Sequence, residues 1–261
     1  MTYGTRKGRK KKPFKKETHD LLFGFHSVLE ALNAGKRQIF SILISKSRRS
    51  GRVHEIQTLA GQKDIDVEIL DRETMDKLTG YANHQGIAAK TGFLPMKKAG
   101  EVIDRVRESD TPCFILVLEN IEDPHNLGAL IRTALCSGVD YILIPKDRSA
   151  SPSAAVSRSS AGAMEHADIY MITNTAAILK SRKAAGVWVS GLDADGDTAL
   201  FDADLTGHIA LVIGGEHKGI RPVVKRECDF LLSIPNKGRI NSLNASVAGG
   251  IAMYEALRQR I

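Results

Sequence analysis

The sequence predicts an α/β protein in which a small α/β domain precedes a larger C-terminal domain built on a parallel sheet. From Cys113 onward, strand-like and helix-like segments alternate along the chain. Several of the strands, including residues 115–118, 141–144 and 209–213, are apolar at every position. Such strands are typical of parallel sheets that are covered on both faces. A chain of 261 residues is long enough for two modest domains.

The first domain, residues 20–93, is predicted from short strands and helices that alternate. Gly35 is expected to end the first helix, because glycine is favoured at helix C-termini. The predicted elements are helix 27–33, strand 39–45, helix 53–61, strand 67–70, helix 72–78 and strand 86–89. Elements of these lengths indicate a three-layer α/β fold.

Residues 94–111 are predicted to be a linker that contains a charged, helix-like piece at 101–107. The second domain then covers residues 112–261. Its predicted elements are strands 114–119, 141–145, 168–172, 187–191, 209–213 and 230–234, with helices 126–137, 153–164, 175–185, 222–227 and a final helix after residue 244. Ligands of parallel sheets bind at the loops that follow the carboxyl ends of the strands, so these loops are the candidate sites.

The N-terminal segment, residues 1–19, is predicted to be a basic tail that is disordered when free. Residues 1–18 carry eight basic residues and one acidic residue, which accounts for the whole formal net charge of +7. Its lysines are expected to contact nucleic-acid phosphates without reading sequence; they are Lys10, Lys11, Lys12, Lys15 and Lys16. The alternative is a tail that only increases solubility.

Composition and cysteine spacing exclude several classes of protein. No apolar run is long enough to span a membrane, and no signal peptide opens the chain. The three cysteines are scattered without a zinc-ligand spacing, and the eight histidines form no ligand-spaced group. We therefore expect a cytoplasmic protein with no metal and no membrane partner.

The first candidate loop, residues 123–132, follows strand 114–119 and opens a helix. Asn126 and Arg132 lie six residues apart in it, and Gly128 allows another backbone or a substrate to come close. An alternative interpretation makes Asn126 a helix cap and Arg132 a surface charge.

The second candidate loop, residues 213–219, contains three glycines and one carboxylate, Glu216. Glycines after an apolar strand suit the close approach of a flat or anionic ligand, although a tight turn explains them equally well. The third loop, residues 236–244, offers Asn and Ser groups that hydrogen-bond a ribose or a purine edge without charge. Gly249 and Gly250 in the following helix predict tight packing there, with a helix–helix contact as the simplest explanation.

Taken together, the three loops resemble the three motifs of the SpoU (TrmH-like) RNA ribose 2′-O-methyltransferases, in the order that the family has them. The matching patterns are N-L-G-x-x-x-R-x-A at 126–134, L-V-I-G-G-E-x-x-G at 211–219 and S-I-P-x-x-G-x-I-x-S-L-N-A-S-V-A at 233–248. Residues 20–93 also resemble the family's N-terminal RNA-binding domain, which is itself similar to a ribosomal protein. This layout is most similar to the branch that methylates a guanosine ribose in 23S ribosomal RNA.

The resemblance implies a trefoil knot of the SPOUT type, S-adenosylmethionine as cofactor, and a homodimer packed through the C-terminal domains. It places the catalytic positions at Arg132, Asn126, Glu216, Ser242 and Asn244. The cofactor-binding positions that it implies are Ile213, Gly214, Gly215, Gly219, Ile234, Leu243 and Asn174. Two departures, His217 for a frequent glycine and Asn236 for an apolar residue, are expected to affect cofactor affinity or loop closure.

The resemblance predicts methyl transfer from S-adenosylmethionine to a ribose 2′-hydroxyl, and guanosine in 23S ribosomal RNA is the expected substrate. The family mechanism makes Arg132 the general base, but a guanidinium beside a phosphate holds its proton firmly. We therefore expect Arg132 to fix a phosphate and to stabilise developing alkoxide charge. A transfer RNA methyltransferase and a non-catalytic RNA-binding ribosome-assembly factor are the alternatives.

Overall fold

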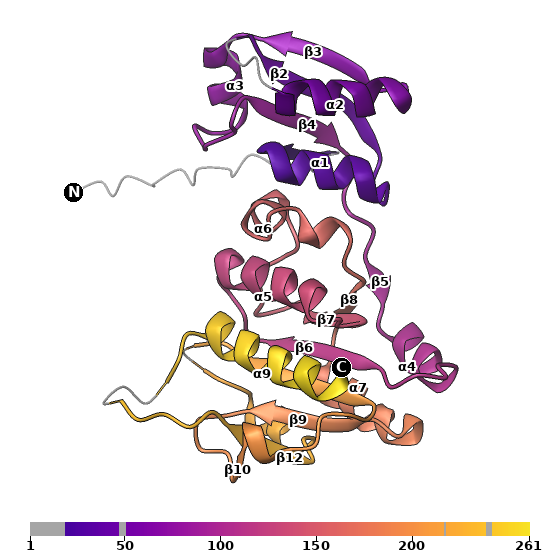
Figure 1. Ribbon diagram of the computed structural model, residues 1–261, viewed down its shortest axis with the longest axis vertical. Coiled ribbons are helices and arrows are strands. Elements are labelled where there is room, and N and C mark those ends of the chain that lie inside the picture. The colour runs from indigo at the N-terminus through magenta and orange to yellow at the C-terminus, as the bar shows by residue number, and fades with distance from the viewer. Residues whose placement is uncertain (1–18, 47–50, 217, 239–241) are drawn as a thin grey trace, which may run out of the picture.

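The computed structural model consists of two sheets stacked end to end along the long axis of the molecule (Figure 1). It describes residues 19–46, 51–216, 218–238 and 242–261. The tail residues predicted to bind RNA lie outside these ranges, as does His217. Among the described residues, no helix has the length and apolar character needed to cross a membrane.

The N-terminal domain is built on a four-stranded sheet in the order β1-β4-β2-β3. Strand β4 runs antiparallel to both neighbours, whereas β2 and β3 are parallel. Its elements are β1 (Asp20–Phe23), α1 (Phe25–Ala34), β2 (Ile39–Ser45), α2 (Gly51–Gln62), β3 (Asp66–Leu70), α3 (Arg72–Leu78) and β4 (Ile87–Thr91). Gly35 ends α1 in a left-handed conformation and donates its N–H to Ala31, which confirms the predicted stop.

The two faces of this sheet are covered by different helices, as the three-layer prediction requires. Ile42 and Ile44 of β2 pack with buried residues of α1 and α2, while the intervening Leu43 packs with Met75 of α3. Because side chains alternate along a strand, one strand thus serves two hydrophobic clusters.

The C-terminal domain is built on an eight-stranded sheet, in the order β10-β12-β9-β11-β6-β7-β8-β5, and every pairing is parallel. Its strands are β5 (Lys97–Lys98), β6 (Phe114–Glu119), β7 (Tyr141–Pro145), β8 (Ile169–Ile172), β9 (Trp188–Leu192), β10 (Thr198–Ala199), β11 (Ile209–Gly214) and β12 (Phe230–Ser233). Its helices are α4 (Gly100–Arg107), α5 (Pro124–Cys136), α6 (Ala154–Ser159), α7 (Thr175–Ser181), α8 (Pro222–Lys225) and α9 (Ala245–Arg260), with 3₁₀ turns η1 (Ala163–Glu165), η2 (Arg182–Ala185) and η3 (Leu200–Asp202).

Helices cover both faces of the parallel sheet, which confirms the prediction made from its fully apolar strands. Leu116 and Leu118 of β6 face a cluster that includes α5, α6 and α9. Ile115 and Val117 face the opposite cluster, which includes α4, α7 and α8. The trefoil knot implied by the family resemblance stays a prediction.

Three short strands escaped the sequence prediction, and the predicted linker is more than a connection. Strand β5 lies at residues 97–98 and pairs with β8, and Val102 and Val106 of α4 are buried in the core. The other two are β1 and the two-residue edge strand β10. Predicted helix 153–164 ends at Ser159, because Ala161 and Gly162, with φ of 52° and 84°, lie in the left-handed region where an α-helix cannot continue.

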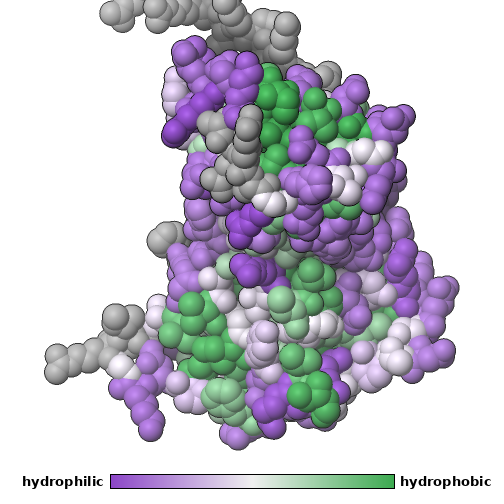
Figure 2. Space-filling model, turned by 45° about the horizontal axis from the view of Figure 1, so that its top comes forward, coloured by the Kyte–Doolittle hydropathy of each residue, from purple (hydrophilic) through white to green (hydrophobic). Residues whose placement is uncertain are grey.

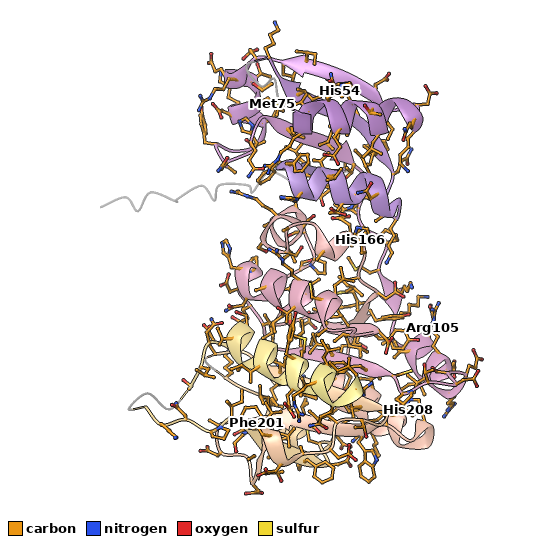
Figure 3. The ribbon with its side chains drawn as sticks, viewed as in Figure 1. His54, Met75, Arg105, His166, Phe201 and His208 are labelled. Atoms are coloured by element: carbon orange, nitrogen blue, oxygen red, sulfur yellow. The ribbon has the colours of Figure 1, made fainter. Side chains whose placement is uncertain are left out.

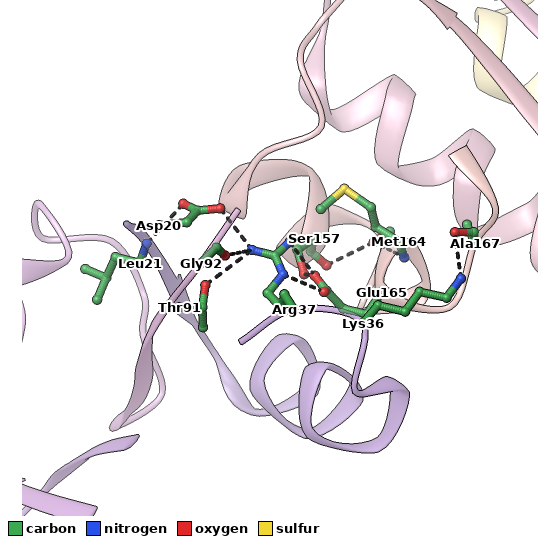
Figure 4. Close-up of polar contacts among 11 residues, drawn as sticks. Asp20, Leu21, Lys36, Arg37, Thr91, Gly92, Ser157, Met164, Glu165 and Ala167 are labelled. Carbon is green, nitrogen blue, oxygen red and sulfur yellow. Dashed lines mark hydrogen bonds and ion pairs between the residues drawn. The ribbon is translucent and has the colours of Figure 1, made fainter. Parts of the chain in front are cut away.

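The two domains meet through a buried ion pair between Arg37, which follows α1, and Glu165 of η1 (Figure 4). Arg37 donates from Nε and Nη2 to the two Glu165 oxygens at 2.9 and 3.1 Å, and both side chains are 1% exposed. Asp20 and Ser157 complete the network at 3.1 and 2.7 Å. On the face shown in Figure 2, the band between the two halves is largely hydrophilic.

Candidate active site

Loops that follow β6, β11 and β12 meet at the carboxyl edge of the parallel sheet. They meet at a trio of side chains: Asn126 in the first turn of α5, Glu216 in the loop after β11 and Asn244 at the N-cap of α9. Asn126 Nδ2 donates to Glu216 Oε1 at 3.2 Å, and Asn244 Nδ2 donates to Asn126 Oδ1 at 3.1 Å. Asn244 Nδ2 also donates to Glu216 Oε1. The three segments are therefore brought together as the sequence predicted.

Local helix chemistry explains why these side chains are available for a site. Asp123 caps α5 by accepting the His125 N–H at 2.9 Å, and Pro124 occupies the first turn. The cap is therefore Asp123 rather than Asn126, which leaves the Asn126 amide to join the trio. Asn244 does cap α9, through Oδ1, while its Nδ2 donates to Asn126 and Glu216.

The glycines of the second loop permit a close approach of backbones that any larger residue would prevent. A Cβ at Gly215 would lie 2.0 Å from the Asn120 carbonyl oxygen, and one at Gly214 would lie 2.3 Å from the carbonyl carbon of Gly219. Asn120 Nδ2 also donates to the Gly219 carbonyl at 3.1 Å. These contacts fold the loop tightly over the end of β6 and hold Glu216 beside Asn126 and Asn244.

The larger cavity at this edge has a volume of about 550 Å³ and is lined by residues from the loops after β9, β11 and β12. Six of the predicted cofactor positions line it: Ile213, Gly214, Gly215, Gly219, Ile234 and Leu243. Ser242 lines it as well. The seventh predicted position, Asn174, is not among the described residues that line this cavity; its side chain caps α7 by accepting the Ala177 N–H at 3.1 Å.

A second cavity of about 340 Å³ adjoins the first and is lined in part by Asn120, Asp123, Asn126 and Lys218. Gly215, Glu216 and Ala245 line both cavities. Two ligands, one in each cavity, would therefore both contact Glu216. Asn126 would contact only the ligand in the smaller cavity.

Arg132 is placed differently from the other predicted catalytic residues. It is exposed on α5, lines neither of the two cavities, and makes no hydrogen bond to another described residue. It lies six residues after Asn126 in the same helix, so the two side chains leave α5 in different directions. Its guanidinium is free to bind an anion that approaches along the flank of α5.

Asp193 and Asp195 line the larger cavity but were not predicted as site residues. They follow β9, and the carboxyl-edge rule that identified the other loops would have identified them too. Asp193 forms an ion pair with Lys225. Asp195 is exposed, and its carboxylate makes no hydrogen bond or ion pair with another residue in the part of the chain that the structure describes.

Two conspicuous glycines serve packing rather than ligand binding. A Cβ at Gly128 would lie 2.0 Å from Ser159 Oγ, so this glycine lets α6 approach α5. A Cβ at Gly249 would lie 2.4 Å from Leu130 Cδ2, so α9 sits against α5, which is the simplest of the predicted explanations. Gly250 has only Thr133 nearby, at 3.9 Å.

Within the described part of the chain, no cluster of His, Cys, Asp or Glu side chains is arranged to hold a metal ion. The polar groups at the site are amides, carboxylates, a lysine and hydroxyls, together with backbone groups of the glycine loop. This arrangement is suited to orienting two organic ligands against each other.

Known proteins share both halves of this architecture. The SpoU rRNA Methylase family matches residues 113–254, and the family described as RNA 2'-O ribose methyltransferase substrate binding matches residues 21–96. The chain is 35% identical to the 23S rRNA (guanosine-2'-O-)-methyltransferase RlmB of Xanthomonas campestris pv. campestris, over 92% of this chain and 96% of that protein.

A second relative is the putative TrmH family tRNA/rRNA methyltransferase YacO of Bacillus subtilis, 35% identical over 94% of this chain and 97% of that protein. Among solved structures, the SpoU methyltransferase AviRb from Streptomyces viridochromogenes, in complex with the cofactor AdoMet, superposes with a TM-score of 0.75. It is 23% identical and the match covers 93% of this chain and 90% of that one, which shows a shared fold. The chain belongs to the SpoU rRNA methylase family.

Proposed function

We propose that this protein transfers a methyl group from S-adenosylmethionine to the ribose 2′-hydroxyl of a guanosine in 23S ribosomal RNA. The observation that carries the proposal is the pair of adjoining cavities that share Glu216. One cavity suits the methyl donor and the other a ribose. Family membership supports the reaction class, and the RlmB relative's name supports the RNA and the nucleoside.

The larger cavity fits S-adenosylmethionine in size and chemistry. Its volume of about 550 Å³ lies within the roughly 300–1,000 Å³ of small-molecule sites. Ile213, Ile234 and Leu243 supply apolar walls for an adenine, and the glycine loop supplies backbone groups. The exposed carboxylate of Asp195 is suited to the ammonium group of the methionine part. When bound, the cofactor supplies an electrophilic methyl group.

The residues of the smaller cavity would position the ribose. Asn126 and Glu216 already hold each other at 3.2 Å and can exchange that contact for one to a ribose hydroxyl. Methyl transfer needs an in-line oxygen, so alignment alone supplies much of the rate. A guanidinium has five N–H donors and no acceptor, so the role of Arg132 is to bind an RNA phosphate and stabilise alkoxide charge rather than to accept the proton.

The test uses labelled S-adenosylmethionine with 23S ribosomal RNA, 16S ribosomal RNA and bulk transfer RNA as separate substrates. Methylated positions are mapped by the resistance of 2′-O-methylated linkages to alkali. We expect label in 23S RNA with wild-type protein and none with Arg132→Ala. Label in transfer RNA would keep the reaction and overturn the substrate. RNA binding without label and without cofactor binding would identify a non-catalytic assembly factor.

Arg132→Lys separates charge from geometry at the same position. Lysine keeps the positive charge but loses the planar pair of donors that binds a phosphate in two places. We expect severely reduced turnover with unchanged cofactor affinity, since Arg132 lines neither cavity. Turnover near the wild-type rate would overturn the assigned role.

We further propose a homodimer formed through the C-terminal domains. Val247 and Tyr254 lie seven residues apart on α9, which places them on one helix face, and both are 51% exposed. Leu135 of α5, which packs beside α9, is 41% exposed. Sedimentation of wild type against Val247→Glu/Tyr254→Glu tests this: a dimer that becomes a monomer is expected, and an unchanged mass contradicts it.

The basic tail, residues 1–19, is proposed to add phosphate contacts in a cytoplasmic enzyme. Deletion of residues 1–18 removes the whole formal net charge of +7. We expect weaker RNA binding and a shallower dependence of affinity on salt, because fewer counterions are released. An unchanged salt slope would contradict the role of the tail.

A further inference from the structure

The N-terminal domain contains a cavity of its own, far from the methyl-transfer site. Its volume is about 390 Å³, and it lies where β2 ends and where the loop between α3 and β4 turns. Figure 3 labels Met75 of α3 in the N-terminal domain, at the other end of the molecule from Phe201 and His208 of the C-terminal domain. The lining includes Arg72, Asp76, Tyr81, Asn83 and His84.

Tyr81 is the unusual residue of this cavity, because it combines a large exposed ring with a strained backbone. Its side chain is 75% exposed, although a tyrosine gains most when its ring is covered. Its φ is 60°, in the left-handed region that bulky residues rarely adopt. Strain of this kind persists where the surrounding structure fixes it and is typical of functional positions.

Hydrogen bonds hold the loop in this conformation. Tyr81 donates its backbone N–H to the Asp76 carbonyl at 2.7 Å. The buried His84 is bound from both sides: Nε2 lies 2.9 Å from Asp76 Oδ1, and Nδ1 accepts the Gly86 N–H at 2.9 Å. Gln85 accepts the Phe25 N–H at 3.1 Å, which ties the loop to α1. The ring of Tyr81 is thus presented from a fixed platform.

The polar groups beside the ring match a nucleotide. Asn83 is exposed and makes no hydrogen bond to another described residue, so its amide offers both a donor and an acceptor to a base edge. The Arg72 side chain is 79% exposed, and its nearest charged contact, Asp76 Oδ2, is 3.7 Å from Nε. It can therefore turn to an RNA phosphate.

We propose that this cavity binds one unstacked nucleotide of the substrate RNA, with its base against Tyr81, its edge on Asn83 and its phosphate on Arg72. The inference rests on the proposed RNA substrate and adds a second contact point for it. Proteins that recognise RNA sequence commonly take splayed bases on aromatic side chains. A nucleotide anchored here would set which stretch of RNA reaches the methyl-transfer site.

The left-handed backbone makes an unusually clean test. Tyr81→Gly removes the ring and also relieves the strain, which offsets the entropic cost of glycine, so the variant should fold like wild type. We expect its affinity for 23S ribosomal RNA to fall roughly 5- to 150-fold, the range for one lost stacking contact. The KM for RNA should rise in parallel, while kcat at saturating RNA and the affinity for S-adenosylmethionine stay unchanged.

Two variants serve as matched controls. Tyr81→Phe keeps the ring and should bind RNA like wild type. Phe201→Ala removes an aromatic ring that is about half exposed and lies in the other domain, and it should leave RNA affinity unchanged.

Arg72→Ala tests the proposed phosphate contact. It should lower the salt slope of RNA binding by about one, as expected for one phosphate contact.

The outcomes separate this inference from the proposed function. RNA affinity that is unchanged by Tyr81→Gly, in a wild-type protein that methylates RNA, overturns the inference and leaves the function standing. Binding that depends on Tyr81 in a protein that methylates nothing supports the inference and overturns the function. A defect seen only with ribosomal particles, and not with protein-free RNA, would mean that the cavity contacts a ribosomal protein, which also overturns it.

Discussion

The polar network that joins the two domains and the polar network at the methyl-transfer site are built on opposite principles. Arg37 and Glu165 are each 1% exposed, and every nitrogen of the Arg37 guanidinium donates a hydrogen bond. In the trio of Asn126, Glu216 and Asn244, the last two side chains are exposed and Asn126 is partly buried, and the trio lies beside two cavities. The first network is closed to solvent, and the second is open to ligands.

The difference follows from what water allows. A buried charge without partners is costly, so a buried network is stable only when it is complete, and completeness fixes one geometry. An exposed network can exchange its internal hydrogen bonds for ligand contacts at little cost. The Arg37–Glu165 network therefore sets how the RNA-binding domain sits on the catalytic domain. The methyl-transfer site keeps groups that can rearrange around a substrate.

The largest expected effect comes from breaking the closed network. Arg37→Ala leaves Glu165 buried without its charge partner, which should lower the free energy of unfolding by about 3–5 kcal/mol. Chemical denaturation measures this. Lys36→Ala is the matched control, because Lys36 bonds Asp168 from the neighbouring position but is 35% exposed, and its loss should cost less than about 1 kcal/mol. Equal losses for the two variants would contradict the comparison.

Disturbing the open network should affect turnover more than stability. Asn244→Asp keeps the oxygen that caps α9 but loses the Nδ2 donor and adds a negative charge beside Glu216. We expect turnover to fall roughly 100-fold, as for other lost polar contacts in active sites, with stability changed by less than about 1 kcal/mol. Single-turnover methylation and thermal unfolding measure the two effects. Wild-type turnover by this variant would mean that the donor has no role.

A third variant tests the backbone that supports the open network. In Gly215→Ala the new methyl group would meet the Asn120 carbonyl at 2.0 Å, and backbone cannot move aside cheaply. We expect stability to fall by about 1–3 kcal/mol and S-adenosylmethionine to bind more weakly. Gly250→Ala is the control: only Thr133 is near, at 3.9 Å, and alanine should stabilise α9 by about 1 kcal/mol. Calorimetric titration of both variants would show whether the cofactor effect is confined to Gly215.

The sequence predicted local elements well where the pattern itself defines the ends. Residues 39–45, 72–78, 114–119 and 141–145 were predicted with the bounds that the structure has. Strands β5 and β10 are two residues long and exist only because a neighbouring strand pairs with them. No local pattern distinguishes such residues from a loop.

The same contrast holds for functional and structural sites. Asn126, Glu216 and Asn244 were predicted because each lies in a recognisable motif after a strand. The Arg37–Glu165 pair was missed, because 128 residues separate its members and neither lies in a motif. The strain at Tyr81 was missed as well, since the left-handed conformation is imposed by the surrounding loop rather than by a glycine at that position.

Asp168 lies between the two extremes of exposure, and removing its charge should have a small, pH-dependent effect on the free energy of unfolding. It accepts from Lys97 at 2.8 Å and from Lys36 at 3.0 Å, and its side chain is 29% exposed. Partial burial opposes ionisation, but the hydrogen bonds from the two lysines outweigh it and lower the pKa of Asp168. The folded state therefore favours the carboxylate.

The sign of the pH dependence follows directly. The stabilisation by Asp168 is fully present above its unfolded-state pKa of about 4, and it is lost as the pH falls through its lower pKa in the folded state. Asp168→Asn should therefore cost less than about 1 kcal/mol at pH 7, and the difference from wild type should shrink below pH 4. Urea unfolding of both proteins at pH 7, 5 and 3 measures this. If the difference in free energy of unfolding between the two proteins stays constant with pH, Asp168 acts through packing. Exposure then does not set the strength of the ion pairs between the two domains.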